Sequence, residues 1–123
     1  MQNINILQAG RNVADTIKRD GNRVTVEDGG SPSWTVEMQE DRTVFTARRE
    51  RCFEGDSWDV KVGPTGVDYK HIGRGFAPMK GKETHIAMPL QPEQYEWAGL
   101  NVIGNLIGVP LGLFFPPAGG QGA

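Results

Sequence analysis

The side chains that could carry out chemistry are few, and the two histidines come first. His71 and His85 are the only histidines, and Asp68 and Cys52 could join them in a metal site or an acid–base site. On a strand, Asp68 and His71 would point to opposite faces, which argues against a local cluster. Histidines from separate strands could still meet. Because most histidines are exposed to solvent or packed in the core, we predict no metal site, no cofactor and no catalytic residue.

Other motifs are equally weak. The sequence "GRGF" at residues 73–76 is too short for a phosphate-binding glycine loop and predicts a turn. The densest basic patch comprises Arg48, Arg49 and Arg51 within "ARRERC". A phosphate or nucleic-acid contact is one use for it. Acidic residues on both flanks favour cross-strand ion pairs instead. We therefore do not expect a nucleic-acid partner.

Charge and cysteine content narrow the class of protein. The chain has 13 basic and 15 acidic residues, a formal charge of −2, and all of them lie within the first 96 positions. This interspersed balance gives no long-range attraction to phosphate backbones or anionic lipid. Cys52 is the only cysteine, which excludes an intrachain disulfide. The first residues lack the pattern of a secretory signal, so we expect a cytoplasmic protein or one assembled in a virion, with a membrane as the alternative.

The middle of the chain shows the period-two pattern of strands. Val24 and Val26 alternate with polar residues, as do Trp34, Val36 and Met38. Similar segments recur every eight to twelve residues, separated by turn compositions. The expected strands are residues 23–27, 34–38, 43–51, 58–62, 67–72 and 84–88. They predict a mainly β fold, with α+β as a variant: a small antiparallel meander, closed as a barrel or sandwich.

The flanking regions complete the expected organisation. Residues 1–22 form an N-terminal segment, with a short helix over residues 12–19 because Val13 and Ile17 share a helical face. The antiparallel β domain covers residues 23–90. A helix is expected over residues 91–109, with Pro92 in its first turn and Pro110 ending it. Residues 110–123, rich in proline and glycine, are expected to be an extended apolar arm.

The last part of the chain is uncharged and apolar. Of 28 Ile, Leu, Val and Phe residues, 10 lie between Leu100 and Phe115, which leaves the first 96 residues with material for only a thin core. Three interpretations remain open for this region. It covers the sheet as an amphipathic helix, it docks as an arm on another molecule, or residues 97–115 span a membrane. Gly104, Gly108 and Gly112, spaced by four, would let another backbone approach closely.

These observations favour a protein that acts by association. We expect a non-enzymatic structural or assembly protein, a homo-oligomerising β-scaffold that also contacts other assembly proteins, by analogy with phage or viral capsid, connector and tail subunits. One alternative is a membrane-associated protein. Another is a protein-binding inhibitor or a small ligand-binding barrel, in which Trp34, Trp58 and Tyr69 line a cavity. The expected contact residues are Trp97, Gly104, Gly108, Leu111, Leu113, Phe114 and Phe115.

Overall fold

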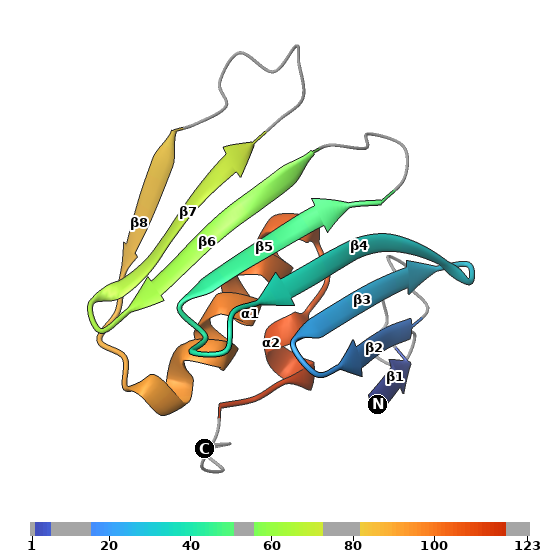
Figure 1. The fold of residues 1–123 in the computed structure, drawn as a ribbon, viewed down its shortest axis with the longest axis horizontal. Helices are drawn as coiled ribbons and strands as arrows, with labels where there is room; N and C mark the ends of the chain where they lie inside the picture. Colours follow the sequence, from blue (N-terminus) through green and yellow to red (C-terminus); the bar gives the residue numbers. More distant parts are fainter. Residues whose placement is uncertain (1, 6–15, 51–55, 73–81, 118–123) are drawn as a thin grey trace.

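The chain folds as one antiparallel sheet backed by a layer of helix (Figure 1). The computed structural model describes residues 16–50, 56–72 and 82–117, and the backbone of residues 2–5. Its eight strands are hydrogen-bonded in chain order. They are β1 Gln2–Asn5, β2 Thr16–Asp20, β3 Arg23–Asp28, β4 Ser31–Met38, β5 Val44–Arg49, β6 Ser57–Gly63, β7 Gly66–Ile72 and β8 Glu83–Ala87. Each strand pairs antiparallel with the next, which makes the sheet a meander.

The predicted mainly β meander is confirmed. All six strands expected from the period-two pattern form, as β3 to β8, and the alternating valines and tryptophans share one face. The sheet is open, because the order of pairing runs from β1 at one edge to β8 at the other without joining them. A single sheet with a helical layer thus takes the place of a barrel, and it encloses no barrel cavity.

The predicted N-terminal helix is wrong in its described part. Residues 16–19, the end of the expected helix, belong to β2, while residues 12–15 lie outside the described residues. Ile17 is fully buried opposite Val26 on β3. The turn at Gly21 makes β2 and β3 a hairpin, so tertiary pairing overrides the helical spacing of Val13 and Ile17. The sheet therefore begins before residue 23.

The C-terminal region forms the helical layer. Pro92 opens a short 3-10 turn, Pro92–Gln94, which leads into α1, Tyr95–Ile107, as predicted for this proline. The helix ends at Gly108, two residues before Pro110, because Gly108 takes up a left-handed conformation and its N–H donates to the Gly104 carbonyl. A second short helix, α2, covers Leu111–Phe114. The region expected as an extended arm is therefore helical at its start, and residues 118–123 lie outside the described part.

The core lies between the inner face of the sheet and this layer. Strand register lines up inner-face residues in rows, such as Val24, Val36 and Ala47 on neighbouring strands. Leu100 and Ile103 of α1 and Leu111 of α2 are fully buried against them. In Figure 1, α1 lies behind the middle strands, and α2 lies next to α1, near the turn between β2 and β3. The C-terminal region thus supplies the apolar cover that the first 96 residues lack.

Gly99 sets how closely α1 approaches the sheet. A Cβ atom built on Gly99 would lie 2.4 Å from ring atoms of Phe45, which is fully buried on β5. Such a distance is shorter than van der Waals contact, and Phe45 is surrounded by core residues. The glycine is therefore required by packing and not by backbone conformation.

We expect Gly99→Ala to lower the free energy of unfolding by about 1–3 kcal/mol, because overpacking outweighs alanine's better helix propensity. Urea denaturation measures this. The control is Gly63→Ala, since no heavy atom lies within 4 Å of a Cβ built there, and we expect it to change stability by less than about 1 kcal/mol. A stabilised Gly99→Ala protein would contradict the packing described here.

Candidate interaction surface

The C-terminal residues predicted to make contacts divide into two groups. Leu111 and Phe115 are buried in the chain's own core, at 0% and 5% exposure. Leu113 points outward and is 75% exposed, while Phe114 and Trp97 are half-buried at the edge of the core. The structure therefore gives the first pair an internal role. It leaves the other three residues at the surface.

The glycines expected to meet another backbone have different environments. A Cβ atom on Gly104 would lie 2.3 Å from the Val109 carbonyl oxygen and 2.9 Å from the Leu111 nitrogen. Gly104 therefore makes room for the backbone of residues 109–111, where the same chain folds back after the helix. Gly108 faces open space, with no heavy atom within 4 Å of a built Cβ. Gly112 packs against the side chain of Asn101.

The accessible side chains of residues 97–117, here called the helical face, include no charged group. Exposed or half-buried members come from both helices and from the turn between them, among them Trp97, Asn105 and Leu113. Within the described residues, neither α1 nor α2 has the length and hydrophobicity that a membrane span requires. Residues 97–115 are instead divided into two helices at Gly108–Pro110.

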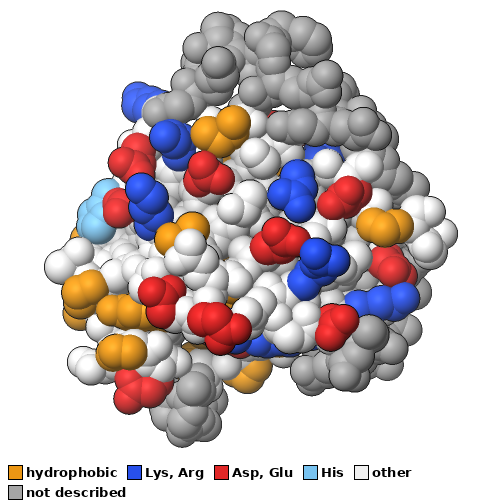
Figure 2. Space-filling view, in the orientation of Figure 1, with side chains coloured by type: hydrophobic (Ala, Val, Ile, Leu, Met, Phe, Trp, Pro, Cys, Tyr) orange, Lys and Arg blue, Asp and Glu red, His pale blue; other side chains and the backbone are white. Residues whose placement is uncertain are grey.

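The opposite side of the molecule, the outer face of the sheet, is densely charged. Figure 2 shows basic and acidic side chains interspersed across it. Cross-strand ion pairs join Lys18 to Glu27 at 3.1 Å and Arg23 to Glu37 at 2.9 Å. Arg48 lies 3.8 Å from Glu37, so this residue of the basic patch takes part in the expected cross-strand pairing, whereas Arg51 lies outside the described residues. The charged outer face thus contrasts with residues 97–117, which carry no charge.

The helical layer is held at its start by Glu96. Arg19 of β2 donates from both terminal nitrogens to the Glu96 carboxylate, at 2.7 and 2.9 Å, and Arg42 donates from Nε at 3.0 Å. The bidentate hydrogen bonds from Arg19 are the largest cause that lowers the pKa of Glu96, and they raise the pKa of Arg19. This cluster, the Glu96 clamp, ties α1 to β2 and to the turn between β4 and β5. Sequence reasoning missed this cluster, because Arg19 and Glu96 are 77 residues apart in the chain.

The histidines do not meet. His71 lies on the inner face, where its Nε2 contacts the Asp56 carboxylate and its ring stacks on Trp58 with 4.4 Å between ring centres. His85 lies on the outer face, 2.6 Å from Asp68. The separation of Asp68 from His71 agrees with the strand geometry, and no three metal-ligating side chains gather among the described residues. Cys52 and residues 73–76 lie outside those residues.

Sequence reasoning missed Asp56. The inner-face positions of β6 are Trp58, Val60 and Val62, and the same alternation extended backwards reaches Asp56. An Asp–His pair fixes the orientation of an imidazole, as in general bases, but here it links the chain before β6 to the end of β7. Tyr69 contacts Trp58 edge to face at 5.9 Å, and Trp34 is covered by the Arg49 guanidinium at 4.9 Å, so these aromatic rings pack on neighbours.

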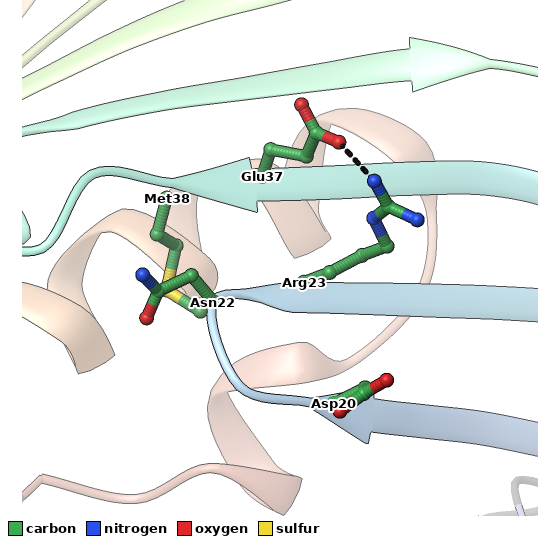
Figure 3. A pocket seen from close by; sticks show the side chains of 5 residues that line it. All are labelled: Asp20, Asn22, Arg23, Glu37 and Met38. Atoms are coloured by element: carbon green, nitrogen blue, oxygen red, sulfur yellow. Dashed lines mark hydrogen bonds and ion pairs between the residues drawn. The ribbon is translucent and has the colours of Figure 1, made fainter.

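An open hollow of about 340 Å³ lies where β2 turns into β3. Figure 3 shows its lining residues, Asp20, Asn22, Arg23, Glu37 and Met38, with Arg23 bonded to Glu37. The Asn22 side chain also donates to Glu40 and accepts from Arg42. These polar groups are used in holding the strand ends together, which makes the hollow a weak candidate for a ligand site.

We expect Glu96→Gln to lower the free energy of unfolding by about 1–2 kcal/mol at pH 7, because a neutral amide weakens the charge-assisted bonds to both arginines. The pKa of Glu96 is lowered in the folded state, so its stabilisation is present above the ordinary pKa of 4.5 and is lost as the pH falls through the folded value. The difference in the free energy of unfolding between wild type and variant should therefore shrink toward pH 3. Urea titrations at several pH values measure this difference. The control is Glu93→Gln, because Glu93 is exposed. A difference in stability that does not change with pH would contradict the Glu96 clamp.

Comparisons of the chain with protein-family models, with curated proteins and with solved structures find no match. The function is therefore proposed from the arrangement of the residues described above.

Proposed function

We propose that this protein is a non-enzymatic scaffold subunit that associates with copies of itself through the helical face. The observation that carries the proposal is that residues 97–117 include no charged side chain, whereas the outer face of the sheet is covered with paired charges. Removing such an uncharged surface from water costs little free energy, because no charged group must be desolvated.

The anchor of this contact is Leu113. It is the one large apolar side chain that is strongly exposed among the described residues. Phe114 follows it in sequence and is half-buried, as is Trp97 near the start of α1. An exposed apolar residue beside half-buried aromatic residues is typical of the centre of a protein–protein contact. The buried residues Leu111 and Phe115 support the anchor from inside.

A second copy is the partner that fits this face. A two-fold contact places the same patch of each subunit against itself, and such a patch must be self-complementary. An uncharged face meets this requirement, because pairing it with its own copy brings no like charges together. The sheet face of another copy is a poorer match, since its ion pairs would be cut off from water by an apolar surface.

We expect Leu113→Asp to weaken self-association at least tenfold, which corresponds to about 1.4 kcal/mol, because a carboxylate would be buried in an apolar contact. Multi-angle light scattering over a concentration series measures the native mass. Wild type should reach the mass of at least two chains, and the variant should remain a monomer at the same concentration.

The matched control is Thr65→Asp, which adds the same charge at an exposed turn between β6 and β7. This variant should associate like wild type. A wild-type protein that stays monomeric at the highest concentrations would refute the proposal, as would equal weakening by the two substitutions.

A further inference from the structure

Strand β8 forms one edge of the sheet. It pairs with β7 along its whole length, from Glu83 opposite Lys70 to Ala87 opposite Gly66, and its other side has no neighbouring strand among the described residues. In Figure 1 no described segment lies beyond it. All of its side chains are exposed except that of Ile86, which is half-buried. The backbone on the outer side of β8 is therefore accessible to another molecule.

The alternation of the strand shows which backbone groups face this edge. The Met88 N–H donates to the Thr65 carbonyl at 3.0 Å. The Ile86 carbonyl lies against Gly66, so it also faces the hairpin formed by β6 and β7. Every second residue of an antiparallel strand bonds to the same neighbour. The N–H and C=O groups that point away from β7 are therefore those of Glu83, His85 and Ala87.

Strand β8 lacks the features with which edge strands usually resist pairing with another chain. Such strands are typically protected by a proline, a lysine or a bulge. The strand contains neither proline nor lysine, and its register with β7 is regular throughout. Its one acidic residue, Glu83, lies at the end of the strand. The edge is thus arranged to accept one further strand, as in β-augmentation.

We propose that β8 pairs antiparallel with β8 of a second copy, in the register that places His85 opposite itself. The outward-facing residues are spaced by two about His85, so this register sets Glu83 opposite Ala87 of the partner subunit and leaves none of them unpaired. It also brings no two acidic groups together. Each His85 side chain lies beside a carboxylate of its own chain, at 2.6 Å from Asp68, which offsets any charge on the two imidazoles.

The same register continues the inner face of the sheet across the joint. Thr84 and Ile86 lie on that face, opposite Tyr69 and Val67 of β7. In the paired edges each Ile86 side chain lies beside Thr84 of the partner subunit, so a half-buried apolar residue is covered further. A second copy is the partner that fits, because the sequence of the strand is complementary to itself about a two-fold axis.

This contact goes beyond the proposed function, because it uses none of residues 97–117. Five residues a side make a contact much smaller than a standard interface. We therefore expect it to form only at concentrations above those at which the helical face associates. The two contacts together join dimers to one another, so that the assembly grows beyond two chains.

A proline at position 87 tests the edge contact. In a Leu113→Asp background, where the helical face no longer associates, Ala87→Pro removes an N–H that faces the edge and leaves the pairing with β7 intact. Light scattering at concentrations above those used for the helical face should show Leu113→Asp passing from monomer to dimer. The added proline should weaken this association at least tenfold. The control Ala87→Thr keeps the N–H and should associate like Leu113→Asp alone.

Failure of the edge contact is distinguishable from failure of the helical face. A Leu113→Asp protein that stays monomeric at the highest concentrations overturns edge pairing, even where wild type associates. Equal association of the proline and threonine variants overturns it as well. Wild type that associates no better than Leu113→Asp refutes the helical face instead, and weakening by the proline then still supports the edge contact.

A pair of cysteines tests the register, and it gives a second readout if the proline variant does not fold. In a Cys52→Ser background, Thr84→Cys and Ile86→Cys of one chain are about 6.8 Å apart along the strand, beyond the Cβ spacing of about 3.5–4.5 Å in disulfides. Across the joint the two positions form a non-hydrogen-bonded pair, with about 4.5 Å between Cα atoms. The disulfide should therefore link two chains.

The oxidised double variant should migrate with the mass of two chains on a denaturing, non-reducing gel. Each single-cysteine variant is the control, because position 84 does not lie opposite itself in this register, and neither does position 86. A double variant that forms no more covalent dimer than the single variants overturns the proposed pairing.

Discussion

The structure depends on covering one apolar face of an open sheet. The buried apolar residues on the inner side of the strands are Val, Ile, Phe, Trp, Met and Ala, and an eight-stranded meander has no second sheet to cover them. Residues 97–117 supply the cover. Because this face cannot remain exposed to water, α1 packs closely on it at Gly99, and the chain folds back after Pro110. The Glu96 clamp then fixes where the helical layer begins.

Much of this fold could be predicted from the sequence, because strands and helix carry strong local patterns. Trp58, Val60 and Val62 alternate with charged neighbours, and Pro92 marks a helix start. The failures lie where a local pattern is short. Val13 and Ile17 suggest a helix by spacing alone, but Ile17 is buried by pairing with Val26, a partner that no local pattern reveals. The glycines and prolines of residues 110–123 predict an extended arm, because a helix of one turn, such as α2, leaves no repeating pattern in the sequence.

The candidate surface was predictable only in part for a related reason. Composition identifies residues 97–117 as uncharged, but it cannot divide them between inside and outside. Leu111 and Leu113 are the same residue type two positions apart, and one is fully buried while the other is 75% exposed. Only the return of the chain at Pro110 decides between them. Long-range pairs such as Arg19 with Glu96 and Asp56 with His71 are likewise fixed by the folded topology.

The internal role of the C-terminal region does not account for all of its composition. A helix that only covers a sheet needs one apolar stripe, and its opposite side is usually charged. In α1 the exposed residue Asn105 is polar but neutral, and α2 adds an exposed Leu113 where a charged side chain would not disturb the core. The missing charge on the solvent side is therefore the feature that internal packing leaves unexplained. The proposed burial of that side against a second molecule accounts for it, and for this reason the association is proposed on the helical face and not on the sheet.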